Sequence, residues 1–229
     1  MGWFRFKGKD SKDYGILISS APQRVRPARR VEEITIPGRS GTLTKDEGTH
    51  DAYMLQMECS TRGTDHIEEI VEWLTGRGEL ILSTEPDKIY VASIYNKISF
   101  SDMIYLYNSF LLQFKVQPYK YSAYPEGDLL ELTAPTSIVN HGTVSSQPII
   151  TVYGSGDISL TVGNLEITLT DVEESITIDS EMQEVFKGTD SQNSKYGAVD
   201  FPALEIGENL ISWAGNVEKV EIIPKWRWL

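Results

Sequence analysis

The chain has 229 residues, 40% of them hydrophobic, and a formal net charge of −12 at pH 7. This length accommodates one large domain or two domains of about 100–130 residues, each able to bury a core. No apolar run approaches the ~18 residues that cross a bilayer. The N-terminus also lacks the apolar stretch of a signal peptide, so we expect neither a membrane partner nor export. The single cysteine, Cys59, cannot form an internal disulfide and is expected to be a small buried residue.

Charge is distributed unevenly along the chain. Residues 1–120 contain 16 Lys+Arg and 16 Asp+Glu, a net charge of 0, whereas residues 121–229 contain 5 Lys+Arg and 17 Asp+Glu, a net charge of −12. Proteins that read nucleic acids present basic patches, so we expect no sequence-specific nucleic-acid partner. The change falls where Pro118, Pro125 and Gly127 interrupt regular structure. We therefore predict a boundary within 119–127, with domains at 1–122 and 123–229.

Sequence patterns in the first half predict strands around one helix. Residues 3–6 and 15–19 flank a polar turn and are expected to form a hairpin. Residues 31–36 are predicted to form a strand that ends in a turn at 37–41, which is rich in Gly and Pro. Further strands are predicted at residues 52–60, 79–82, 89–95 and 105–116.

Helical spacing interrupts this β pattern once. Asp65 and Glu68 have the spacing of a capping box, and Gly76 is a suitable C-terminal stop. The sequence therefore predicts a helix of about three turns with one apolar face packed on a sheet. The residues of that face are Ile67, Ile70, Val71 and Leu74.

The second half shows no helical pattern and predicts a β-sandwich. Its short, alternating segments are residues 148–153, 158–162, 165–169, 175–178, 184–186, 209–213 and 218–223. Residues 154–157, 163–164 and 214–216 are expected to be turns between them. The predicted fold class of the whole chain is mainly β.

Few residues suggest chemistry. His50, His66 and His141 lack metal-ligand spacing with one another or with Cys59. No Gly-x-Ser-x-Gly elbow is present, and the glycines at 2–9 and 154–156 do not match nucleotide-binding spacing. In each acidic pair, at 32–33 and at 173–174, the two neighbouring side chains point to opposite faces of a strand, so they cannot share a proton. We therefore predict no catalytic, cofactor-binding or metal-binding residues and no enzymatic activity.

Aromatic residues near the C-terminus allow two interpretations. Exposed on a sandwich, they could stack on sugar rings, as in a lectin. Alternatively, Trp213 belongs to the core, while Trp226 and Trp228 pack on the neighbouring domain. The residues concerned are Tyr196, Phe201, Trp213, Trp226 and Trp228.

Several segments of the chain form an ordered set: WFRFKGKDSKDYGI at 3–16, IPGRSGTL at 36–43, GSGDI at 154–158, IDSE at 178–181, FPAL at 201–204, NLISW at 209–213 and PKWR at 224–227. This set resembles the distal tail proteins (Dit) of siphophages, in the form typical of phages and prophages of Gram-positive bacteria. Single segments are weak indications, but the ordered set covers the chain from end to end.

The resemblance implies a structural hub of a phage or prophage-derived tail tip, made and assembled in the cytoplasm of the bacterial host. It implies an N-terminal domain with one helix that forms a homo-hexameric ring and a C-terminal galectin-like β-sandwich. The ring would join the tail tube and major tail protein to a tail-associated fibre or lysin protein of the baseplate. Whether the last few residues pack on the N-terminal domain is left open. The alternative is a carbohydrate-binding adhesion module for the host cell wall, although no stretch is long enough for an inserted carbohydrate-binding module.

Overall fold

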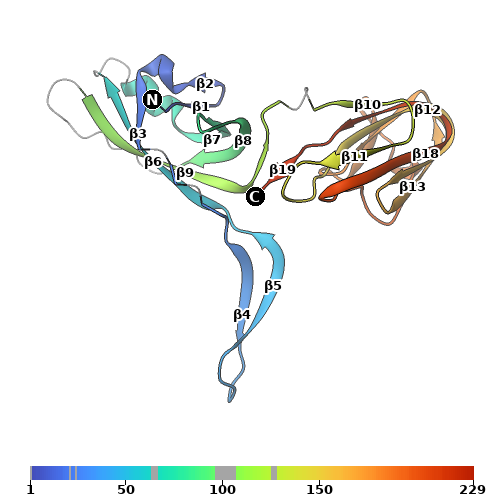
Figure 1. Ribbon diagram of the computed structural model, residues 1–229, viewed down its shortest axis with the longest axis horizontal. Coiled ribbons are helices and arrows are strands. Elements are labelled where there is room, and N and C mark those ends of the chain that lie inside the picture. The colour runs from blue at the N-terminus through green and yellow to red at the C-terminus, as the bar shows by residue number, and fades with distance from the viewer. Residues whose placement is uncertain (1, 21, 24, 63–66, 96–106, 125–127) are drawn as a thin grey trace. The chain divides into compact units, whose positions relative to one another are not determined.

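The computed structural model describes residues 1–229 apart from positions 1, 21, 24, 63–66, 96–106 and 125–127 (Figure 1). The chain divides into two compact units, Met1–Ala123 and Tyr124–Trp228. Strands dominate both units, so the predicted mainly β fold class is confirmed. Within the described part of the chain, no helix has the length and apolar character needed to span a membrane.

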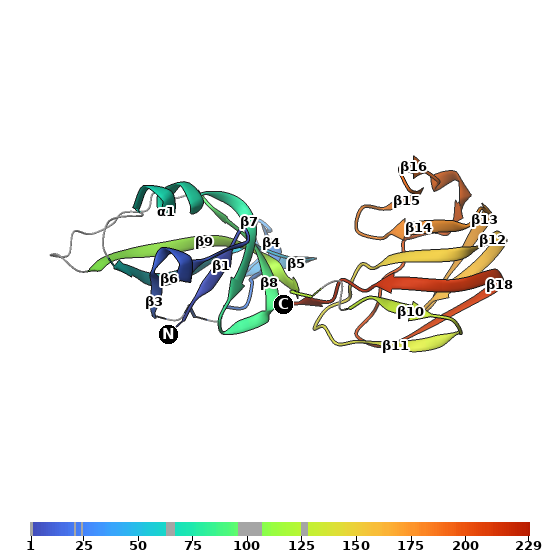
Figure 2. The same cartoon turned by 90° about the horizontal axis from the view of Figure 1, so that it is seen from above.

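The first unit is a curled antiparallel sheet with strand order β2-β1-β7-β8-β9-β6-β3 (Figures 1 and 2). A 3-10 helix (Ser11–Tyr14) and α1 (Ile67–Trp73) accompany it. The strands of this sheet are β1 (Phe4–Phe6), β2 (Lys9–Asp10), β3 (Ile16–Ser20), β6 (Tyr53–Arg62), β7 (Gly76–Leu82), β8 (Glu85–Ile94) and β9 (Tyr107–Ser122).

The predicted hairpin between residues 3–6 and 15–19 is wrong. Lys7 and Gly8, with φ of 50° and 76°, form a tight turn that pairs β1 with β2 instead. The other edge of β1 pairs with β7, and β3 pairs with β6. Near the two ends of the sheet, the residue before β1 meets β3: the Ile18 N–H donates to the Gly2 carbonyl at 3.3 Å. The curl of the sheet brings these ends together.

Helix α1 packs through Trp73. The Trp73 indole donates to the Phe6 carbonyl at 2.8 Å, and its ring stacks on Phe4 and Tyr14, with centroids 5.7 and 4.8 Å apart. Ile70 is fully buried, whereas Val71 is exposed, so the predicted apolar face includes one residue too many. The helix is shorter than the three turns predicted, and Asp65 of the expected cap lies outside the described residues.

The second unit is built on two long strands that pair with each other, β12 and β18. Strands β10 and β11 pair with β18, and strands β13 and β14 pair with β12 (Figure 2). Farther out, β15 pairs with β14, β16 with β15, and β17 with β13. The bounds are β10 (Leu130–Leu132), β11 (Thr136–Asn140), β12 (Ile149–Val162), β13 (Leu165–Val172), β14 (Ser175–Asp179), β15 (Glu184–Lys187), β16 (Asp190–Ser191), β17 (Tyr196–Gly197), β18 (Gly207–Ile223) and β19 (Arg227–Trp228).

Two predicted turns, at 154–157 and 214–216, are irregularities within β12 and β18. The pairing register shifts between Tyr153 and Gly154 and again between Ser155 and Ser159. A Cβ on Gly154 would lie 2.3 Å from the Asn216 carbonyl oxygen, so only glycine permits this approach. Bulges let one strand bend and serve both layers of a sandwich. Residues 148–153 and 158–162, predicted as separate strands, therefore belong to the single strand β12. Residues 209–213 and 218–223 likewise belong to the single strand β18.

Candidate assembly surfaces

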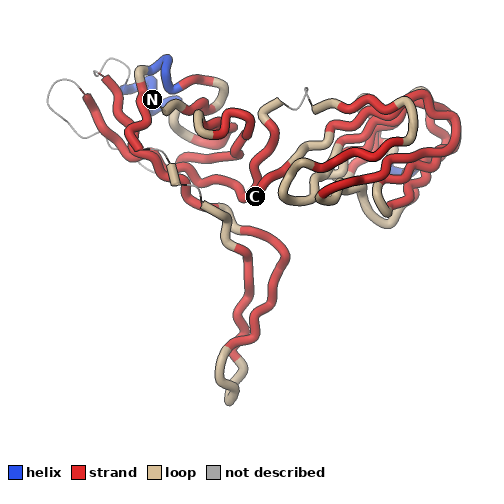
Figure 3. The backbone as a smooth tube through the Cα atoms, viewed as in Figure 1, coloured by secondary structure: helices blue, strands red, loops and turns tan. Residues whose placement is uncertain are grey.

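Among the described residues of the first unit, a hairpin arm is exposed along nearly its whole length. It consists of β4 (Arg29–Thr35) and β5 (Thr42–His50), which form a separate two-stranded sheet. The arm projects away from the curled sheet (Figures 1 and 3). Strand β4 corresponds to the predicted strand at 31–36, but β5 was not predicted, because its polar sequence lacks an alternating apolar pattern.

Apolar side chains on the arm are left uncovered by their own chain. Ile34 pairs directly with Leu43, and these residues are 39% and 50% exposed. Ile36, just beyond the end of β4, is also exposed. An isolated two-stranded hairpin is at best marginally stable in water. The arm is therefore suited to lie against another protein surface.

Ion pairs join the polar positions of the arm. Arg29 lies 2.9 Å from Asp46, and Lys45 lies 3.6 Å from Glu32. These groups are exposed, so each pair contributes little to stability. Glu32 pairs across the hairpin while its neighbour Glu33 is on the other face opposite Thr44, which agrees with their interpretation as surface charges.

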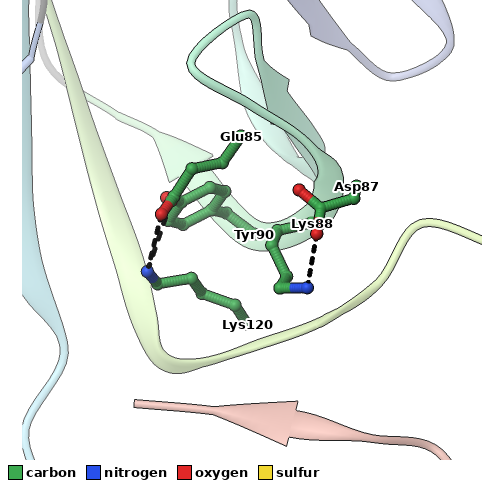
Figure 4. A network of polar contacts seen from close by, with 5 residues as sticks. All are labelled: Glu85, Asp87, Lys88, Tyr90 and Lys120. Atoms are coloured by element: carbon green, nitrogen blue, oxygen red, sulfur yellow. Dashed lines mark hydrogen bonds and ion pairs between the residues drawn. The ribbon is translucent and has the colours of Figure 1, made fainter. Parts of the chain in front are cut away.

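A polar network joins β8 to β9 (Figure 4). The Tyr90 hydroxyl donates to the Glu85 carboxylate, and the Lys120 ammonium lies 3.3 Å from that carboxylate and 5.5 Å from the centroid of the Tyr90 ring. Nearby, the Lys88 ammonium donates to Asp87 at 2.6 Å. This hydrogen bond is the main reason why the pKa of the Asp87 carboxyl lies below its usual value.

The geometry of this network is that of a structural contact holding β8 and β9 together. Tyr90 and Lys120 are cross-strand partners, and Glu85 bonds to both. Burial, and secondarily the charge of Glu85, raises the pKa of Tyr53 to about 12. The adjoining cavity is about 30 Å³, little more than a water molecule needs, which leaves no room for a substrate.

Aromatic residues of the second unit mostly serve its own packing. Trp226 is 7% exposed within the core, whereas Trp213 and Trp228 are half-buried at its margin. Trp213 therefore packs against the core, as one interpretation expects, but only at its margin. Trp226, which that interpretation expects on the neighbouring domain, is instead a buried member of this core. Tyr196 and Phe201 stack with centroids 4.9 Å apart, and the Tyr196 hydroxyl donates to the Asp200 carbonyl. Burial, followed by the charge of Asp200, raises the pKa of Tyr196 to about 12.

The remaining candidate residues do not converge. Cys59 is buried, and burial raises the pKa of its thiol to about 12. His50 packs against the ring of Tyr119, and His141 against Trp226, while His66 lies outside the described residues. Among the described residues, no three His, Cys, Asp or Glu side chains are placed to hold a metal ion. Glu174 of the pair at 173–174 lies 3.1 Å from Lys187 at the surface.

These features define a class: a mainly β protein of two compact units, with an exposed arm suited to contact with another chain. No family model matches the chain, and no curated protein matches it either. A solved structure does, described as "Crystal Structure of SPP1 Dit (gp 19.1) Protein, a Paradigm of Hub Adsorption Apparatus in Gram-positive Infecting Phages". The similarity covers 100% of both chains with a TM-score of 0.77 and 17% sequence identity. The chain thus has the fold of a distal tail protein, as its sequence segments predict.

Proposed function

We propose that this protein is a non-enzymatic structural subunit of a phage or prophage-derived tail tip. In this proposal six copies form a ring that joins the tail tube to a tail-associated fibre or lysin protein. The full-length similarity in fold to a hub protein of an adsorption apparatus motivates the role. The observation that carries it in this chain is the arm, because its exposed apolar residues and the marginal stability of an isolated hairpin favour contact with another protein.

The charge distribution supports an arrangement with the first unit innermost. Residues 1–120 carry 16 − 16 = 0 net charges, so copies can approach closely around an axis. Residues 121–229 carry 5 − 17 = −12 and repel one another. Such repulsion is weakened when the acidic units lie farther apart than the Debye length, about 8 Å at physiological salt. Acidic units at the periphery therefore fit a closed ring best.

Electron microscopy of the concentrated protein, or of tail tips that contain it, tests the proposal. The expected particle is a sixfold ring of 6 × 25.8 = 154.8 kDa with the acidic units outside. Dilute protein can run as a monomer when a neighbouring tail protein is needed to close the ring. Rings of another symmetry, or rings with the acidic units lining the lumen, would overturn it. So would a monomer that binds cell-wall glycans, which is the outcome expected of an adhesion module.

A further inference from the structure

We propose that the second unit has a strand-addition site at the free edge of β11, where an extended, basic segment of another protein pairs with the chain. This inference goes beyond the proposed ring and holds for any symmetry of the assembly. Strand β11 lies at the margin of its unit (Figure 2). Among the described strands it pairs with β18 alone, so its other edge is open.

The open edge of β11 differs from the other edges of its sheet. Among the described residues, four strands of this nine-stranded sheet pair with one neighbour only: β10, β11, β16 and β17. Proteins keep such edges from pairing by making them very short or by placing charges on them. Strands β10, β16 and β17 have three, two and two residues. Strand β11 has five residues, Thr136–Asn140, and none of them is charged. It is therefore the least protected of these four edges.

Two residues of β11 direct their backbone groups out of the sheet. The Leu210 carbonyl accepts a hydrogen bond of 2.8 Å from the turn that follows β12, so Leu210 directs its backbone groups to that side. Successive residues of a strand alternate in this direction, so Asn209 faces β11 and pairs with Ile138. The neighbours of Ile138, Ser137 and Val139, therefore offer their N–H and carbonyl groups to the open edge.

Exposed apolar side chains flank this edge. Val139 is 43% exposed and Leu210 is 50% exposed, whereas Ile138 is buried in the core. Val139 lies directly opposite Glu208 on β18. Leu210 lies opposite Ser137, two residues along, so both pairs share the outer face of the sheet. An added strand would extend this face and cover part of its apolar surface.

The charge beside the edge indicates the charge of the partner. Glu208 is exposed, and within the described part of the chain it forms no ion pair. The basic residues of this unit are engaged elsewhere: each lysine pairs with another carboxylate, and Arg227 donates to the Ser145 carbonyl. These lysines are Lys187, Lys195, Lys219 and Lys225. A cation for Glu208 must therefore come from a partner.

A lysine on an added strand can reach Glu208. The partner residue opposite Val139 would lie two strand spacings from Glu208, about 10 Å away. The apolar stem of a lysine can lie over Val139 while its ammonium group meets the carboxylate. Such a lysine covers apolar surface and supplies the absent positive charge. The site therefore favours extended segments with Lys or Arg on the face that continues the outer face of β11.

A second copy of this chain is a poorer occupant of the edge. Two copies paired through β11 would bring together two acidic regions, because residues 121–229 carry a net charge of −12. They would also place two Glu208 carboxylates on one continuous sheet, with no cation between them. Like charges repel and oppose such an association. A basic segment of another protein has the complementary charge.

Peptide selection on the full chain tests the site. The probe is a displayed library of random ten-residue peptides, counter-selected on the Val139→Pro variant. Proline removes the outward N–H, but an edge strand tolerates it where that N–H faces solvent. Selected peptides should carry Lys or Arg at alternate positions. Val139→Pro should weaken their binding about tenfold, the effect of losing one backbone hydrogen bond. Val139→Thr keeps the N–H and is the matched control, which should bind as the native chain does.

Methylation of the peptide backbone provides a second measurement, which needs no variant of the chain. One synthetic copy of a selected peptide is N-methylated at every second residue, and another copy at the residues between. A strand pairs through alternate amides, so one copy should lose binding and the other should keep it. Glu208→Gln should weaken the unmethylated peptide about two- to fivefold, as the loss of an exposed ion pair does.

Several results would overturn the site. These are no enrichment over the counter-selection, equal binding of the two methylated peptides, or selection of acidic peptides in place of basic ones. Rapid disulfide linkage of Ser137→Cys copies to one another would also overturn it, because a second copy would then occupy the edge. Sixfold rings without peptide binding would leave the proposed function intact. Peptide binding by a protein that forms no rings would support this site and contradict the ring.

Discussion

Ile34 and Leu43 face each other across the two strands of the arm, yet they remain 39% and 50% exposed. A cross-strand apolar pair contributes roughly 0.2–1 kcal/mol to a sheet. Burying the same side chains completely would contribute about 1.5–3 kcal/mol each. Most of the stabilisation available to this pair therefore depends on a partner surface.

Substituting both residues should separate assembly from folding. In Ile34→Thr/Leu43→Thr, threonine keeps the β preference of both strands but removes apolar surface. We expect the free energy of unfolding of the isolated protein to change by no more than about 0.5 kcal/mol per site, as at other exposed positions. Rings should be lost in electron microscopy. Val139→Thr, on the exposed side of β11, is the control and should leave both properties unchanged.

The core tryptophan of the second unit should dominate its stability. Trp226→Ala removes a side chain that is 7% exposed and should lower the free energy of unfolding by about 3–5 kcal/mol. Trp213→Ala should cost clearly less, because Trp213 packs only at the margin of the core. Urea unfolding followed by circular dichroism measures both variants. An equal or larger loss for Trp213→Ala would contradict the placement of Trp226.

Local sequence patterns predicted most of the strands, but not how they pair. Residues 3–6 and 15–19 are strands, as predicted, yet they pair with β7 and β6, which lie far away in the sequence. The two-residue turn at Lys7 and Gly8 leads into β2. That strand is too short for its sequence to show the alternation of apolar and polar residues that marks a strand. Pairing between distant segments depends on tertiary packing, which periodicity does not report.

The assembly surfaces were less accessible to sequence reasoning than the fold. An alternating pattern at 31–36 normally indicates a half-buried strand, so the exposure of Ile34 was not expected. The resemblance of residues 36–43 to distal tail proteins did mark the turn of the arm, although it did not reveal its exposure.

Glycine at position 154 should be required by the bulge of β12. Gly154→Ala places a Cβ 2.3 Å from the Asn216 backbone oxygen, so the two long strands must separate. Overpacking of this kind typically costs about 1–3 kcal/mol, and more when backbone must move. Gly156→Ala is the control: its φ of +80° is strained, but no atom lies within 4 Å of the added Cβ. The Gly154 variant should melt at the lower temperature of the two.

The Cys59 thiol should be protected in the folded protein. Burial raises its pKa from 9.0 to about 12, which lowers the thiolate fraction at pH 8. Because the thiolate is the reactive form, alkylation should be at least about a hundredfold slower than in urea-unfolded protein. The unfolded thiol releases its proton at lower pH than the folded one, so stability should fall as the pH rises above about 9. Met54→Cys, exposed on the same strand, should add a rapidly alkylated site.

Limited proteolysis should separate the two units near residues 119–127. Strand β9 continues through Pro118 to Ser122, and Lys120 is held by Glu85, so cleavage is expected beyond Ser122 and not at Lys120. A protease of broad specificity should release two resistant fragments that correspond to 1–122 and 123–229. The exposed arm offers a second site at its turn, near Arg39, and the fragment masses distinguish the two. A first cut within 149–169 would contradict the boundary, because that segment contains β12 and most of its pairing with β13 and β18.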